Sequence, residues 1–266
     1  MFEPLRAAAS GLRGPYWPGC DELNRVIASR RECIASAAGR PLRFVGQQPR
    51  QKTFEDKYEP RIFLRGEVQM RSCNWHDLFN ALMWLTFPAA KAALNQRHYR
   101  EIERQRASGA QNRGPAQDAL TLFDEGGVIV VASDPALAAL LTGCEWKQLF
   151  WYRRVEVVQR MRFYLFGHAL YEKALAPFLG VTGRGVMFEV EHAFFTLPLA
   201  AQLPALDARL AAHIGNAARF VTTRELAPVP VLGVPGWCDA NACEQYYDNL
   251  DYFRPARTGS LGSSTP

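Results

Sequence analysis

Apolar residues recur every three or four positions along several stretches of the chain, which is the spacing of an amphipathic helix. Such stretches predict helices over residues 22–38, 135–143 and 204–217. Asp21 and Asp134 stand in front of the first two and are suited to cap them. The stretch 74–109 predicts two helices with a break at Phe87-Pro88, because proline favours the first position of a helix and disfavours helix before it.

Short apolar runs bounded by turn residues predict strands over 62–71, 120–133, 161–166 and 186–195. Gly66 could divide the first run into two strands, and Asp124-Glu125-Gly-Gly is typical of a β-hairpin turn in the second. The third run leads through a Gly-His pair into a further helix. Short strands among helices predict an α+β fold, a single mixed domain with a β-hairpin and an irregular C-terminal arm.

Composition shifts divide this domain into segments. We predict an N-terminal helical segment (1–45), an α+β core (46–226), an extended C-terminal arm that packs on the core (227–257) and a disordered tail (258–266). Residues 46–60 are polar and indicate a loop, and residues 107–117 indicate a flexible connection.

The overall composition is that of a globular protein, with 48% hydrophobic and 21% charged residues among 266. No apolar run reaches the roughly 18–20 residues of a membrane span. The start, MFEPLRAAASG, lacks the basic and apolar regions of a signal peptide. The six cysteines form no C-x-x-C pair. We therefore expect a cytoplasmic protein with reduced thiols and without a membrane span.

The net charge of +5 is unevenly distributed. Basic residues gather in the segments 91–113 and 147–162, which could bind a phosphate-bearing ligand or nucleic acid. The alternative is that both segments are solvated helix faces. The second segment overlaps WKQLFWYRR, whose aromatic rings could stack bases, although such a stripe more often belongs to the core.

His76 is the first candidate for catalysis. It lies in NWHDLFN, and a helix places His76 and Asn80 on one face, where they could orient a water molecule, hold a metal or exchange protons. Asp77 is a second catalytic candidate, but Asn74 before it is suited to cap the helix, and Asp77 then completes a capping box. A structural role is the alternative for both His76 and Asp77.

His168 is the next candidate, where a predicted strand meets a helix. A helix N-terminus disfavours the cationic form of histidine, which suits a neutral base. Glu172 lies four residues further along, so the two side chains could form a catalytic histidine–carboxylate couple or a local hydrogen bond.

Asp124 and Glu125 form the third candidate site. Paired carboxylates can hold a divalent metal such as Mg²⁺ or do acid–base work. The alternative is a simple turn. The motifs of P-loop, dinucleotide-binding, zinc-protease and α/β-hydrolase proteins do not occur in the sequence, so those classes lose their usual support.

Several separated stretches resemble one known family. They are NWHDLFNALMWLTFPAAKAALN, DALTLFDEGG, WKQLFW, FGHALYEK and YYDNLDYFRP, in this order between Glu59 and Pro255. The chain is similar in these stretches to the proteobacterial family catalogued as domain of unknown function 3025. It departs from the pattern in GWCDANACEQYYDN, where the family's run is expected to be acidic and free of cysteine. The resemblance directs attention to Trp75, His76, Asp77, Asn80, Lys91, Asn95, Asp124, Glu125, His168 and Glu172.

Two functions from different classes fit these features. The first is a metal-dependent hydrolase of a phosphate-containing substrate, with His76 or His168 as general base, Asp124 and Glu125 as metal ligands, and Lys91 with Asn80 and Asn95 in substrate binding. The second is a non-catalytic module that binds protein or nucleic acid, in which the histidines and aspartates are buried struts. Convergence of His76, His168 and the Asp124–Glu125 pair in one place would favour the enzyme.

Overall fold

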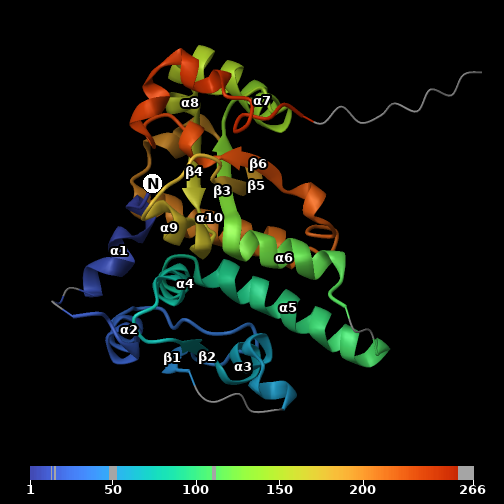
Figure 1. Ribbon diagram of the computed structural model, residues 1–266. Helices are drawn as coiled ribbons and strands as arrows, with labels where there is room; N and C mark the ends of the chain where they lie inside the picture. Colours follow the sequence, from blue (N-terminus) through green and yellow to red (C-terminus); the bar gives the residue numbers. More distant parts are fainter. Residues whose placement is uncertain (13, 15, 48–52, 110–111, 257–266) are drawn as a thin grey trace, which may run out of the picture.

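The computed structural model describes the chain except for residues 13, 15, 48–52, 110–111 and 257–266. A four-stranded sheet forms its centre (Figure 1). The strand order is β4 (Met161–Leu165), β3 (Gly127–Ala132), β5 (Thr182–Glu189) and β6 (Ala227–Pro230). β3 runs parallel to β5 and antiparallel to β4. All six residues of β3 are buried, which indicates that both faces of the sheet are covered.

The helices beside this sheet position the candidate site. They are α4 (Trp75–Thr86), α5 (Pro88–Ser108), α6 (Pro115–Gly126), α9 (His168–Ala174) and α10 (Leu199–Gly215). α4 packs against α9, and α5 packs against α6 and α10. Asp207 of α10 accepts hydrogen bonds from the backbone N–H groups of Ala89 and Ala90, and so caps the start of α5 from another element.

A smaller unit lies beside α4 and α5, at the bottom of Figure 1. Strands β1 (Arg43–Gly46) and β2 (Glu67–Met70) pair in parallel and are connected through α3 (Tyr58–Arg65), while α2 (Cys20–Ala28) packs against β1. The short helices α1 (Arg6–Ala9), α7 (Pro135–Thr142) and α8 (Arg154–Arg160) complete the set named in Figure 1. The fold is thus mixed α+β, as the sequence predicts.

The predicted β-hairpin is wrong. Residues up to Gly126 form α6, and only Gly127 onward is strand. The antiparallel neighbour of β3 is β4, which follows α7 and α8 along the chain. The reason is that Ala119, Leu120 and Phe123 are buried on one helical face, and this burial outweighs the local turn preference of Asp-Glu-Gly-Gly.

Two further elements differ from prediction near the N-terminus. The first half of 62–71 belongs to α3, and Gly66 ends that helix in the left-handed region (φ 71°) before β2 begins. The predicted helix 22–38 ends at Ala28. Its N-cap is Gly19, whose backbone N–H binds the Glu22 carboxylate, and not Asp21.

Other expectations are confirmed. α4 ends and α5 begins at Phe87-Pro88, Asp134 caps α7 through the N–H of Ala136, and His168 opens α9. The helix predicted over 204–217 is α10 and begins at Leu199. In WKQLFWYRR, Trp146 and Phe150 are buried, which favours the core alternative for these rings.

The C-terminal arm continues after β6 as three short 3-10 turns and not as an extended strap. It lies against α8 and the turn before it, in the orange to red part of Figure 1. Trp146 donates to the backbone carbonyl of Arg254, and Arg154 donates to Asn241. The predicted tail 258–266 lies outside the described residues. Within the described parts of the chain, every helix is too short or too polar to cross a membrane.

Candidate acid–base site

Two helix starts bring the candidate histidines together. Asn74 caps α4 by accepting a hydrogen bond from the backbone N–H of Asp77 at 3.0 Å, which fixes the first turn that carries His76. His168 opens α9 directly after Gly167. A Cβ on Gly167 would overlap the backbone carbonyl of Glu125, so only glycine lets the start of α9 approach the end of α6.

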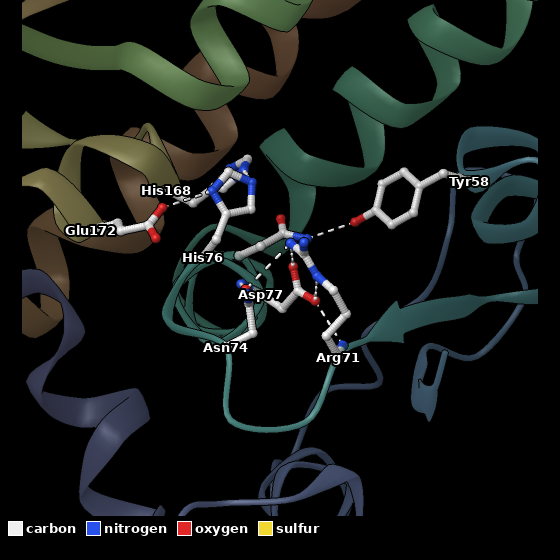
Figure 2. A network of polar contacts seen from close by, with 8 residues as sticks. Tyr58, Arg71, Asn74, His76, Asp77, His168 and Glu172 are labelled. Carbon is white, nitrogen blue, oxygen red and sulfur yellow. Dashed lines mark hydrogen bonds and ion pairs between the residues drawn. The ribbon is translucent and has the colours of Figure 1, made fainter. Parts of the chain in front are cut away.

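The two rings contact each other directly. Nε2 of His76 lies 2.9 Å from Nε2 of His168, and the rings meet edge to face (Figure 2). Nδ1 of His76 lies 3.0 Å from Oε2 of Glu172. One Nε2 must therefore carry a hydrogen and the other its lone pair, because two N–H groups or two lone pairs would repel each other at this distance.

Asp124 continues this line into the interior. Nδ1 of His168 lies 3.9 Å from Oδ2 of Asp124, which is too far for a hydrogen bond. Lys91 donates to Oδ1 of the same carboxylate. The resulting five-residue line, here called the relay, consists of Glu172, His76, His168, Asp124 and Lys91.

The inner residues of the relay are more buried than the two outer ones. The side chains of Glu172 and His76 are 44% and 31% exposed, whereas those of His168 and Lys91 are 7% and 4% exposed. Burial lowers the pKa of His168 to about 4 despite the nearby carboxylate, so this ring is neutral at neutral pH. Burial favours the protonated form of Asp124, but the Lys91 ammonium outweighs it and holds the pKa of Asp124 below its ordinary value, so Asp124 is anionic.

Other predicted residues stand beside the relay. Asp77 forms two ion-pair contacts with Arg71, at 2.9 and 2.8 Å, in addition to its place in the capped turn (Figure 2). Arg71 holds the pKa of Asp77 below its ordinary value, although burial opposes this. Asn80 donates to the hydroxyl of Tyr58 at 2.6 Å. These contacts give Asp77 and Asn80 structural partners.

The amide of Asn95 donates to the carboxylate of Glu59 at 2.7 Å. Asn95 and Lys91 are both buried, and both face a small cavity that Asp124 also lines. Of the substrate-binding candidates, these two therefore lie at the inner end of the relay and not at its exposed end.

Glu125 is exposed at the end of α6, and the described structure gives it no contact with the relay. Within the described residues, no group of three or more His, Cys, Asp or Glu side chains is placed to hold a metal ion. Lys91 already occupies one oxygen of Asp124. Asp124 and Glu125 therefore do not meet as the paired carboxylates of a metal site in the part of the chain that the structure describes.

The two basic segments are largely used inside the fold. In the first, Arg97 is buried and donates to backbone carbonyls at the end of α10. In the second, Lys147, Arg153, Arg154 and Arg162 each donate to oxygen atoms of this chain. These contacts explain much of the clustering of basic residues without a phosphate ligand.

Three residues at the inner end were not identified from the sequence. Tyr58 and Glu59 lie in a stretch predicted as loop, and Trp84 was not singled out. Trp84 follows His76 and Asn80 at helical spacing, so the same periodicity that paired those two could have found it.

Comparison with known proteins gives one match. A family model described as "Protein of unknown function (DUF3025)" matches residues 42–257. No curated protein and no solved structure matches the chain.

Proposed function

The chain belongs to the DUF3025 family, and from this premise we propose that it is a hydrolase of a phosphate-containing substrate with His76 and His168 as its acid–base centre. The observation that carries the proposal is the direct contact between the two Nε2 atoms at 2.9 Å, with a carboxylate near the other nitrogen of each ring. Such a pair of histidines can accept one proton from a reacting group and later return it.

The proposed mechanism uses the pair as a single base and then as a single acid. In this mechanism the contact between the rings opens, Nε2 of His76 accepts a proton from the attacking water, and the resulting hydroxide attacks phosphorus. Glu172 and Asp124 stabilise the cationic pair from its two ends. The pair then returns the proton to the leaving oxygen, so that no net charge remains on the protein.

The roles follow the exposure of each group. His76 is the catalytic residue that substrate can reach, since its side chain is 31% exposed. His168 is buried and neutral and is the proton partner of His76. Lys91 and Asp124 are positioning residues, because their ion pair keeps a negative charge beside His168.

The choice of a phosphate ester is supported by charge near His76. Arg71 binds Asp77 in the first turn of α4, and its side chain is 52% exposed (Figure 2). Its Nε and Nη2 groups donate to Asp77 and Asn74, so we propose a single contact from Nη1 of Arg71 to a phosphate oxygen. The net charge of +5 and the exposed Arg100 favour an anionic substrate as well.

A non-catalytic module is the second candidate. It is favoured by the internal partners of Asp77, Asn80 and Asn95, which serve as struts whatever else they do. In that case the histidine pair would be a structural contact, and the exposed surface around Trp75 would bind a partner. Trp75 is 46% exposed beside His76.

Hydrolysis of p-nitrophenyl phosphate and bis-p-nitrophenyl phosphate separates the two candidates. We expect turnover by the parent protein, a loss of about 10²- to 10⁴-fold in His76→Gln, and no loss in His192→Gln, which changes an exposed histidine elsewhere. Turnover should survive EDTA, because Lys91 neutralises Asp124. Absence of turnover, or turnover that His76→Gln leaves unchanged, contradicts the proposal.

A further inference from the structure

A small cavity lies at the inner end of the relay, between α3, α4, α5 and α6. Its volume is about 10 Å³, which is close to the space needed by one water molecule. Its lining includes Tyr58, Glu59, Trp84, Lys91, Asn95 and Asp124. Two carboxylates and one ammonium group thus face a space of molecular size.

Unpartnered polar atoms gather around this cavity. The described residues contain five buried side-chain atoms without a hydrogen-bond partner, and two of them belong to lining residues: Nε1 of Trp84 and Oδ1 of Asn95. Trp84 is 1% exposed and Asn95 is 2% exposed. Two of the other three, in Asn80 and His168, belong to residues that contact or face the lining. Leaving such an atom unsatisfied destabilises the fold, so their concentration in one place points to an occupant.

We propose that the cavity holds one ordered water molecule, bound between the indole N–H of Trp84 and the amide oxygen of Asn95. One lining group is a free donor and the other a free acceptor, so the occupant must accept and donate at once. A metal cation cannot accept from Trp84 and is repelled by Lys91. An anion cannot donate to Asn95 and is repelled by Glu59 and Asp124. Water meets both requirements at this volume.

The water also completes the surroundings of the ion pair. The Lys91 ammonium has three hydrogens, and one of them goes to Asp124. Lys91 lines the same cavity, so one of its remaining hydrogens can be donated to the water. This site does not depend on hydrolytic activity, because it follows only from the lining groups.

Water contacts of the Trp84 indole test the proposal in solution by ¹⁵N-edited NMR. We expect a cross-peak between this N–H and water that changes sign between NOESY and ROESY spectra, which marks a long-lived contact and not hydrogen exchange. Trp146 is the matched control. Its indole is also buried but donates to the carbonyl of Arg254 at 2.7 Å, so it should show no such cross-peak. Absence of the cross-peak at Trp84 overturns the proposal.

Two variants exclude a false signal from the nearby hydroxyl of Tyr58. Asn95→Leu removes the acceptor at similar volume and should abolish the cross-peak, whereas Tyr58→Phe should retain it. A cross-peak that persists in Asn95→Leu, or that vanishes in Tyr58→Phe, overturns the assignment to water. A high-resolution crystal structure of the parent protein gives a direct second reading, and an empty cavity there would also overturn it. The indole signals are assigned by Trp84→Phe, or by triple-resonance spectra if that variant does not fold.

Discussion

Nε2 of His76 and Nε2 of His168 lie 2.9 Å apart, although 92 positions separate the residues in the sequence. Both rings stand at the start of a helix, where the helix dipole disfavours a positive charge. Glu172 and Asp124 offset this effect at opposite ends of the pair. The arrangement therefore favours one shared proton over two charged rings.

The shared proton predicts that the two histidines act as one unit. His76→Gln and His168→Gln should each lower kcat/KM for a phosphate ester by about 10²- to 10⁴-fold, and the double variant should be no worse than the weaker single variant. Steady-state kinetics on the four proteins of this cycle measure the coupling. Losses that multiply would show that the rings act independently.

Burial of neutral His168 predicts a pH-dependent stability. The unfolded chain binds a proton at this histidine near pH 6.5, and the folded chain only near pH 4. Between these values the unfolded state binds more protons, so the free energy of unfolding falls as the pH falls, by up to roughly 3 kcal/mol. The contribution is fully present above pH 6.5 and is lost toward pH 4.

Urea denaturation of the parent protein and of His168→Gln from pH 4 to 7.5 checks this. In the variant, the free energy of unfolding should fall less steeply as the pH falls, because the contribution of His168 is missing. Asp207 titrates in the same window with the opposite sign, because burial raises its pKa from 3.8 to about 6 and the folded state then binds more protons. It is present in both proteins, so the difference between them isolates His168. Equal slopes would contradict a buried neutral ring.

Local signals in the sequence predicted helix boundaries and caps correctly where the signal and its effect lie in the same element. Pro88 marks the break between α4 and α5, and Asp134 caps α7, because both effects depend on neighbouring backbone alone. The Asp-Glu-Gly-Gly stretch wrongly predicted a hairpin turn, because its conformation depends on the residues that α6 buries. The cap of α5 by Asp207 could not be predicted, since it comes from α10, more than a hundred residues away.

In the candidate site, too, the sequence predicted the residues but not the contacts between distant elements. Spacing singled out His76, His168, Asp124 and Glu172, and the structure places all four in the relay. Spacing also paired Glu172 with His168 on one face of α9, but Glu172 contacts His76 instead. The packing of α4 against α9 brings Glu172 to His76. This packing joins distant parts of the chain, so the spacing of residues within one helix does not predict it.

The ion pair between Lys91 and Asp124 predicts a large and non-additive effect on stability. Lys91→Met leaves Asp124 buried without its cation and should lower the free energy of unfolding by about 3–5 kcal/mol. Adding Asp124→Leu removes both charges and should recover most of this loss. Urea denaturation measures the cycle.

The pair Arg104–Glu101 is the control for this cycle, since its carboxylate is as buried as that of Asp124 but its cation is 67% exposed. Arg104→Met should change stability by less than about 1 kcal/mol. If Lys91→Met lowers the free energy of unfolding by no more than this control, Lys91 does not hold Asp124 as an anion at the inner end of the relay.

The cap of α4 predicts a smaller effect. Asn74→Ala removes the acceptor for the N–H of Asp77 and should lower the free energy of unfolding by about 1 kcal/mol. Asn74→Asp keeps an acceptor and should retain stability. Thermal unfolding of the three proteins compares them. A neutral Asn74→Ala would mean that Arg71 and Asp77 hold this turn without the cap.

A substitution of Glu172 should affect the reaction rate without affecting the stability of the fold. Its side chain is 44% exposed, so its pair with His76 should contribute less than about 1 kcal/mol to stability. Hydrogen bonds to a charged group contribute about 1.5–3 kcal/mol where geometry is fixed, which corresponds to about 10- to 100-fold in rate. Glu172→Gln should therefore lower kcat by that factor, with little change in KM or melting temperature.

The pH profile distinguishes this role from a structural one. Without the Glu172 carboxylate, the cationic form of the histidine pair loses a partner, so the acid limb of the kcat/KM profile should move to lower pH. Glu172→Asp keeps the charge on a shorter side chain and should shift the limb less. A loss of kcat with an unchanged profile would mean that Glu172 does not act through the histidine pair.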